Sequence, residues 1–227
     1  MSQSHANFTI GLLIFPRMTQ LDFTGPFEVF ARIPDTKVHV LWKTIEPITS
    51  DTGLAILPTT TLDDCPALDL ICIPGGPGQV ALMDDEQILT FVRRQGLQAK
   101  FVTSVCTGSL VLGAAGLLQG YQAGTHWMSR DQLAYFGATL VEKRIVVDRN
   151  RITGGGVTAG IDLALYVASL ITNEQTARTI QLGLEYDPEP PFNSGSPEKA
   201  NPAEVSAARQ RAAAMLSERL AATQRAA

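Results

Sequence analysis

Cys106 is the residue in this sequence best placed to act as a nucleophile. It lies in the segment Ser104-Val-Cys106-Thr-Gly-Ser109, between an expected strand over 101–105 and an expected helix that begins near Gly108. A reactive side chain at such a sharp strand-to-helix turn, a nucleophile elbow, stands clear of the sheet. The free N–H groups and positive dipole end of the following helix favour the thiolate over the thiol. These features predict covalent chemistry at this sulfur.

Asp22 is the expected partner of that sulfur. Its neighbours Leu21 and Phe23 are apolar, so its carboxyl is expected to be partly desolvated in the loop between the first strand and the first helix. A helix cap or a solvated charge is the alternative role. In a parallel sheet, ligand sites gather at the carboxyl ends of strands, where Asp22, the turn Gly75–Gly76 and Cys106 all lie in the expected topology. Three separate loops are therefore expected to converge there.

Several other residues near these loops have two possible roles. Gly75–Gly76 can offer a backbone N–H to a developing negative charge, or it can simply allow a tight turn. Thr107 can bind substrate or cap the next helix. His126 can act as a general base or contact substrate, or it can be an ordinary core or surface residue. Gly154–Gly156 lacks the lysine and spacing of a phosphate-binding loop, so no nucleotide is expected.

The pattern along the chain predicts an α/β fold, with a mostly parallel sheet flanked by helices on both faces. The expected strands cover residues 8–15, 38–42, 54–57, 70–74, 101–105, 139–141, 145–147 and 152–153. The expected helices cover residues 27–33, 86–98, 108–118, 128–136, 159–171 and 174–185. The first helix is expected to carry Pro26 in its first turn with Thr24 or Gly25 as its cap, and Gly120 is expected to end the helix over 108–118.

The C-terminal part is expected to be a helical extension of the same domain. Residues 187–197 are rich in Pro, Ser and Gly, which predicts a surface loop. Asn201 is expected to cap one helix over 203–222 that docks on the domain, with Pro202 and Glu204 in a capping box. The sequence thus predicts one domain over residues 1–227, with a core over about 8–186 and an extension over 187–227. The arginines of the last helix are expected to form a solvated face: Arg209, Arg211, Arg219 and Arg225.

Composition limits the possible partners. The formal net charge is −4, which leaves no basic surplus for gripping a phosphate backbone, so a nucleic-acid partner is not expected. No apolar run reaches the roughly 18 residues of a membrane span, and the start MSQSHANFTI lacks the layout of a secretory signal. A cytoplasmic protein is therefore expected. Cys65, Cys72 and Cys106 lack the spacing of a zinc site or a disulfide framework, so reduced thiols and no metal are expected.

Five segments together resemble the DJ-1/PfpI superfamily, a flavodoxin-like branch of the class I glutamine amidotransferase-like folds. They are LDFTGPFEVF, ICIPGG, SVCTGSLVLGAAGLLQG, THW and ITGGGVTAGIDLAL, and the resemblance spans about residues 8–186. Within the superfamily, LDFTGP, SVCTGS and PPFNSGSP resemble the isocyanide hydratases, which convert an isocyanide and water to an N-substituted formamide. The resemblance implies Cys106 as nucleophile, Asp22 as acid/base, and Thr107 and the Gly76 N–H as groups that bind the reacting atoms. It also implies a homodimer without cofactor.

Under this resemblance, the expected mechanism is covalent. Cys106 attacks the isocyanide carbon while Asp22 protonates it, which gives a thioimidate, and the Asp22 carboxylate then activates water. A mainly apolar pocket is expected because isocyanide substituents are alkyl or aryl groups.

Two differences from related proteins narrow the range of expected functions. Protease-like members of the superfamily carry His directly after the nucleophile, whereas this chain has Thr107, so peptidase activity is not expected. Related transcription regulators continue into a DNA-binding half, for which this sequence is too short. Two rivals remain open: a glyoxalase- or deglycase-like enzyme acting on dicarbonyls, and a non-catalytic sensor in which a low-pKa Cys106 thiol is oxidised or occupied.

Overall fold

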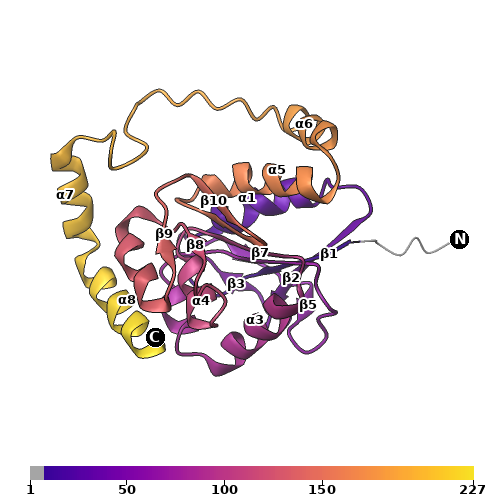
Figure 1. Cartoon of the computed structure of the whole chain (residues 1–227), viewed down its shortest axis with the longest axis horizontal. Helices are drawn as coiled ribbons and strands as arrows, with labels where there is room; N and C mark the ends of the chain where they lie inside the picture. Colours follow the sequence, from indigo (N-terminus) through magenta and orange to yellow (C-terminus); the bar gives the residue numbers. More distant parts are fainter. Residues whose placement is uncertain (1–7) are drawn as a thin grey trace, which may run out of the picture.

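A seven-stranded sheet with the order β10-β11-β7-β6-β1-β2-β5 forms the centre of the protein (Figure 1). The computed structural model describes residues 8–227; residues 1–7, which carry part of the expectation about a secretory signal, lie outside the described residues. Neighbouring strands are parallel except β10 and β11. The strands are β1 (Phe8–Leu13), β2 (Thr36–Trp42), β5 (Thr60–Thr61), β6 (Leu70–Ile73), β7 (Phe101–Val105), β10 (Ile145–Asp148) and β11 (Arg151–Gly154). The predicted mostly parallel sheet is confirmed.

Helices cover both faces of this sheet. Figure 1 shows α1 and α5 on one face and α3 and α4 on the other. The central strands are apolar on both sides, since Ile10, Leu12 and Ile71 are fully buried. The helices are α1 (Gln20–Phe30), α2 (Gln79–Leu82), α3 (Glu86–Gln98), α4 (Gly108–Ala114), α5 (Ala159–Ile171) and α6 (Glu174–Gly183), with the 3-10 helix η1 (Trp127–Phe136) beside α4. The α/β layers follow from burying apolar strands between amphipathic helices.

The first helix begins earlier than expected. α1 starts at Gln20 after Thr19, so Asp22 lies in its first turn and not in a loop, and neither Thr24 nor Gly25 is its cap. Pro26 is inside the helix, where a proline normally removes a backbone hydrogen bond. Its ring packs against the bare backbone of Gly160 in α5, where an added Cβ would lie 3.0 Å from the ring. Tertiary packing therefore overrides the local preference of proline.

The helix after Cys106 ends earlier than expected. α4 stops at Ala114, and Gly116, with φ of 74°, takes the left-handed conformation that was expected at Gly120 as the helix end. The Gly116 N–H donates to the Gly113 carbonyl at 2.8 Å, and the Leu117 N–H donates to Leu112 at 2.9 Å. These two bonds form a Schellman motif, which satisfies the last carbonyls of the helix.

The remaining small strands lie outside the main sheet. The expected strand over 54–57 is β4 (Ala55–Ile56), which forms an antiparallel pair with β3 (Ile48–Thr49). The expected strand over 139–141 is β9 (Thr139–Leu140), which pairs in parallel with β8 (Gln122–Ala123). Each pair is a local two-stranded sheet. The two expected strands are therefore present, but the strand that each one pairs with was not predicted.

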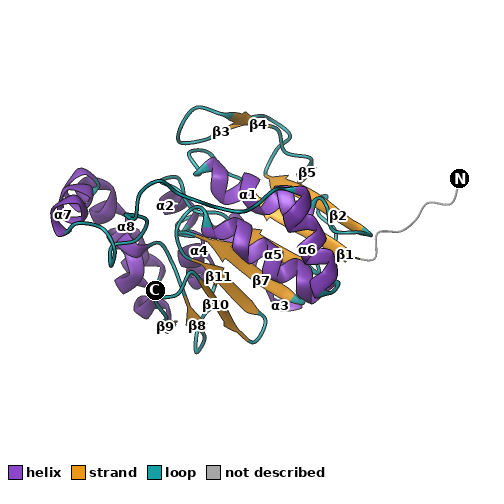
Figure 2. Ribbon diagram, turned by 90° about the horizontal axis from the view of Figure 1, so that it is seen from above, coloured by secondary structure: helices purple, strands orange, loops and turns teal. Residues whose placement is uncertain are grey.

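The C-terminal extension contains two helices instead of the single one expected. They are α7 (Pro202–Arg211), which has the predicted capping box at Asn201, and α8 (Ala213–Ala226). Figure 2 shows the long loop between α6 and α7 crossing the molecule. The break between them falls at Ala212, and α8 packs against α2, α4 and η1. In the part of the chain described, no helix combines the length and apolar character required to span a membrane.

The arginines of this extension do not all face solvent. Arg209, Arg211 and Arg225 are exposed, as expected, but Arg219 is only 3% exposed. The expectation of a solvated arginine face is therefore wrong for Arg219, because α8 turns this side chain toward the protein body.

Candidate active site

Cys106 adopts a strained backbone conformation at the end of β7. Its φ is 58°, in the left-handed region that L-residues other than Asn, Asp and His rarely occupy. The surroundings hold this conformation: the Cys106 N–H donates to the Gly154 carbonyl at 3.1 Å, and its carbonyl accepts from Thr125 Oγ1 at 3.0 Å and Ser109 Oγ at 3.3 Å. Strain of about 1–3 kcal/mol persists only where such contacts over-determine it, and it is typical of functional positions.

Asp22 is brought to the same place by the first turn of α1. Its side chain is fully buried, and its Oδ2 accepts from the Gly75 N–H at 2.9 Å. Among the described residues, its Oδ1 has no partner of good hydrogen-bond geometry. Burial raises the pKa of Asp22 to about 7, against the opposing effects of the Gly75 N–H and of Cys106. A carboxyl with a pKa near neutrality can both donate and accept a proton at working pH.

The Gly75–Gly76 turn connects Asp22 to Thr107. The Gly76 N–H donates to Thr107 Oγ1 at 3.1 Å, while the Gly75 N–H donates to Asp22. Gly75 has no space for a side chain, since an added Cβ would lie 2.5 Å from Thr107 N and 3.0 Å from Asp22 Oδ2. Both N–H groups of the turn therefore bond to protein side chains in this structure, and the turn positions the acid and the hydroxyl.

The Cys106 thiol shares this buried space with Asp22. Desolvation raises the pKa of Cys106 well above its ordinary range, and the negative charge of Asp22 raises it further, while the Thr107 N–H and Arg219 lower it. The expectation that the end of the following helix favours the thiolate is therefore wrong for the resting site, because burial has the larger effect on the pKa of Cys106. The thiol and the carboxyl also affect each other's pKa through their proximity, and no hydrogen bond of good geometry joins them among the described residues. The resting pair thus consists of a protonated thiol beside a carboxyl that titrates near neutral pH.

His126 lies at the rim of the site and not on the sulfur. Its Nδ1 accepts from the Met128 N–H at 3.3 Å, and among the described residues no hydrogen bond joins it to Cys106. Burial lowers the pKa of His126 to about 4, helped by the positive charges of Arg219, Arg130 and Arg209. The ring is therefore neutral at pH 7. Its neighbour Thr125, which the sequence did not single out, holds the Cys106 carbonyl instead.

A cavity of about 580 Å³ opens beside His126. Thr125, Trp127 and Val157 line it together with the charged side chains of Arg130 and Lys143. Neither Cys106 nor Asp22 lines this cavity, so the expectation of a mainly apolar substrate pocket stays a prediction. Among residues 8–227, no group of three or more His, Cys, Asp or Glu side chains is arranged to hold a metal ion.

Three further polar residues reach the site from distant segments and were missed by sequence reasoning. Gln79, the first residue of α2, is fully buried, as is Ser129 in η1. Arg219 of α8 donates to both of them. Gln79 comes directly after the Gly75–Gly76 turn, and this proximity was the only signal in the sequence that could have indicated it. No local pattern marks Ser129 or Arg219.

Comparison with known proteins places this geometry in a family context. The DJ-1/PfpI family model matches residues 9–170. An isonitrile hydratase of Pseudomonas putida is 57% identical over 218 residues, which cover 96% of each chain. The crystal structure of a ThiJ/PfpI family protein from Pseudomonas syringae superposes with a TM-score of 0.92 at 42% identity, covering 98% of this chain and 96% of the other.

A third relative has a different architecture. The HTH-type transcriptional regulator GbdR of Pseudomonas aeruginosa is 30% identical over 167 residues, but these cover 70% of this chain and only 45% of the regulator. The similarity is thus confined to less than half of that protein. The family model matches most of the chain and two relatives match it over nearly its whole length, so this chain belongs to the DJ-1/PfpI family.

Proposed function

We propose that this protein hydrates isocyanides to N-substituted formamides. The observation that carries the proposal is the 57% identity, over 96% of both chains, to an isonitrile hydratase. The buried pair of Cys106 and Asp22 supports it, because hydration of an isocyanide needs a nucleophile and a proton donor at one carbon. The pair supplies both groups within one water-poor space.

The first step forms a covalent intermediate. The proton of the resting pair moves from the Cys106 sulfur to Asp22, which leaves a thiolate and a carboxylic acid. The thiolate attacks the terminal carbon of the isocyanide, so a C–S bond forms, one C–N π pair moves to nitrogen, and the carbon keeps the lone pair that it already carried. Asp22 transfers its proton to that carbon and becomes a carboxylate, which yields a thioimidate, Cys–S–CH=N–R. Burial favours the neutral acid that this step requires.

The second step releases the product. The Asp22 carboxylate takes a proton from water as the water oxygen attacks the thioimidate carbon, and the nitrogen receives that proton. The resulting carbon bears OH, NHR and sulfur. Loss of the hydroxyl proton forms the carbonyl as the C–S bond breaks, which releases the formamide and returns one proton to the Cys106–Asp22 pair. Protons balance over the cycle, because water supplies one hydrogen to nitrogen and one to the pair.

Thr107 and the glycine turn complete the arrangement. Gly75 holds the carboxyl by its N–H, and Gly76 holds the Thr107 hydroxyl by its own. Thr107 Oγ1 accepts that bond, so its own hydroxyl hydrogen is free to donate to the reacting group. In this proposal, Gly76 acts on the substrate through Thr107.

The decisive experiment is an assay that measures repeated turnover of a simple alkyl isocyanide and identifies the formamide product by NMR. Cys106→Ala should abolish turnover, and Asp22→Asn should lose most of it, while circular dichroism shows both variants folded. Cys65→Ala is the matched control, because Cys65 is a half-buried thiol bonded only to Gln95 and the Pro66 carbonyl. Turnover near the wild-type rate by Cys106→Ala would contradict the proposal.

The two rival functions are distinguished in the same experiment. A glyoxalase- or deglycase-like enzyme would convert methylglyoxal to lactate in parallel assays and leave the isocyanide unchanged. A sensor would show one oxidation event per Cys106 and no repeated turnover.

The further properties implied by the family are part of the proposal. We infer a cytoplasmic homodimer that works without a cofactor, and one domain in which the core 8–186 and the extension 187–227 unfold together. Packing of α8 on α2, α4 and η1 supports the single domain. Light scattering during size-exclusion chromatography measures the oligomer, and one cooperative denaturation transition is expected for the domain.

A further inference from the structure

Arg219 is a buried cation held only by neutral partners. Its Nε donates to Gln79 Oε1 at 3.0 Å, and one Nη donates to Ser129 Oγ at 3.0 Å. The other Nη lies 3.4 Å from the Met215 sulfur. The side chain belongs to α8, so its guanidinium is placed by the docking of the C-terminal helix.

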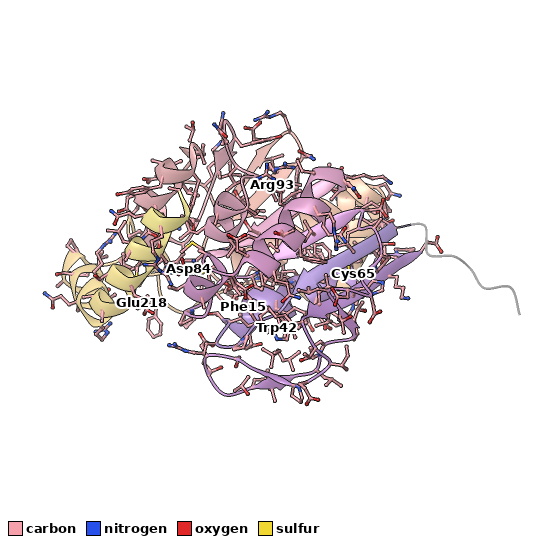
Figure 3. All side chains as sticks on the ribbon, turned by 90° about the horizontal axis from the view of Figure 1, so that it is seen from below. Phe15, Trp42, Cys65, Asp84, Arg93 and Glu218 are labelled. Atoms are coloured by element: carbon pink, nitrogen blue, oxygen red, sulfur yellow. The ribbon has the colours of Figure 1, made fainter. Side chains whose placement is uncertain are left out.

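Within residues 8–227, this guanidinium has no ion-pair partner. Among the described residues, no Asp or Glu oxygen lies within 4.0 Å of Arg219. Arg225 on the same helix shows the contrast, because it is exposed and forms an ion pair with Asp84 at 2.5 Å. Figure 3 shows Asp84 beside the yellow helix that carries Glu218. Burying a charge without an ion-pair partner costs free energy. A nearby group that becomes negatively charged during the reaction would offset this cost, and this guanidinium would stabilise that group.

The candidate for that negative charge is the Cys106 sulfur. Gln79, which orients Arg219, donates its backbone N–H to the Gly76 carbonyl at 3.2 Å. The Gly76 N–H in turn donates to the hydroxyl of Thr107, the residue next to Cys106, so hydrogen bonds connect the guanidinium to the site. The positive charge of Arg219 lowers the pKa of Cys106, and the sulfur acts in return on the pKa of Arg219. The Nε2 group of Gln79 is buried and has no partner among the described residues, so this amide retains a free donor.

The charges that act on the sulfur come from two different helices and have opposite effects. Asp22 from α1 opposes ionisation of the thiol, and Arg219 from α8 favours it. Burial lowers the pKa of His126, and Arg130 from η1 and Arg209 from α7 add to this effect together with Arg219, so His126 is neutral. Arg219 is thus the cation that acts on the sulfur itself.

We propose that Arg219 is an electrostatic positioning residue of the Cys106 site: its guanidinium, oriented by Gln79 and Ser129, stabilises the thiolate that attacks the substrate. It does not take part in a bond-forming step. In the first step, its positive charge offsets the negative charge of Asp22 while the proton passes from the sulfur to the carboxyl. In the second step, it stabilises the thiolate again as the C–S bond breaks. The C-terminal extension is therefore part of the catalytic site.

The proposal rests on Cys106 being the nucleophile, and alkylation tests it without isocyanide turnover. Iodoacetamide modifies the thiolate, so the pH dependence of its rate at Cys106, followed by peptide mass spectrometry, reports the ionisation of this sulfur. Arg219→Met should slow alkylation at pH 7 by about tenfold and move the profile to higher pH. Arg219→Lys, which keeps the charge, should restore most of the rate. A loss of turnover in Cys106→Ala without any change of alkylation in Arg219→Met would refute this inference alone.

A second variant covers the case in which Arg219→Met does not fold. Gln79→Glu keeps the size of the side chain and places a carboxylate on Arg219, which neutralises its field, so alkylation of Cys106 should slow in the same direction. Arg225→Gln is the control, because it removes an exposed arginine from the same helix and should leave the alkylation profile unchanged. An unchanged profile in Gln79→Glu, or an equal shift in Arg225→Gln, would show that Arg219 only anchors the helix.

Discussion

The burial of Asp22 makes the stability of the fold depend on pH in a direction opposite to that of most carboxylates. The pKa of this carboxyl rises from 3.8 to about 7 on folding, mainly by desolvation. Below pH 3.8 it is protonated in both states and has no effect. Between pH 3.8 and about 7 the unfolded chain has lost a proton that the folded chain keeps, so the free energy of unfolding falls as pH rises, and the loss is complete above pH 7. One pKa unit is worth about 1.4 kcal/mol, so the full loss is about 4 kcal/mol.

Asp22→Asn removes this dependence and retains an oxygen for the Gly75 N–H. We expect the variant to gain about 4 kcal/mol relative to wild type between pH 4 and pH 8, with no further gain above pH 8. Urea denaturation at unit pH intervals, followed by circular dichroism, measures the free energy of unfolding of both proteins.

Asp84→Asn is the control for this experiment. Arg225 holds the pKa of Asp84 below its usual range, so its stabilisation is present above the unfolded pKa and is lost as pH falls. The difference between Asp84→Asn and wild type should therefore shrink toward acid pH. Parallel stability curves for Asp22→Asn and wild type across pH 4–8 would refute the reasoning, because they would mean that the buried carboxyl has an ordinary pKa.

Three further results are expected. Gly75→Ala should lower turnover, measured by formamide release, at least about 100-fold, because the added Cβ would displace Thr107 and Asp22. Turnover near the wild-type rate would mean that the turn does not position these two residues. His126→Asn should retain most turnover across pH 6–8, since the ring is neutral there and makes no hydrogen bond to Cys106 within the described residues, and a large loss would identify a missing contact with substrate. Asn201→Ala should remove about 1 kcal/mol of stabilisation from the N-cap of α7 and so speed amide hydrogen exchange in this helix about fivefold. Unchanged exchange would show that the preceding loop alone determines where the helix begins.

Local patterns predicted the elements that local interactions determine. The helix over 86–98 was predicted with the bounds of α3, because its apolar spacing is helical and Asp85 caps it by accepting from the Ile88 N–H. The strand over 101–105 and the helix over 159–171 match β7 and α5 for similar reasons. The turn at Cys106 was predicted because strand, small residues and helix follow one another directly in the sequence.

The properties that depend on distant contacts were not predictable. Pro26 looked like the start of a helix, and only its packing on Gly160 explains why the helix runs through it and why Asp22 lies in its first turn. The pKa of Cys106 was expected to fall because a helix follows it, but burial by the whole domain raises it. Arg219 lies in an alanine-rich helix, and its partner Gln79 is 140 residues away, so nothing local distinguished it from its exposed neighbours.

The long sequence separation of Gln79 and Arg219 also bears on how the enzyme is made. During translation, Cys106 leaves the ribosome roughly ten seconds before residue 219, at the usual rate of 5–20 residues per second. A nascent chain in that interval has its sulfur but not the guanidinium that favours ionisation. Before the domain folds, that thiol is exposed and has its ordinary pKa, so alkylating agents and peroxide can reach it, and only the finished fold buries it beside Asp22.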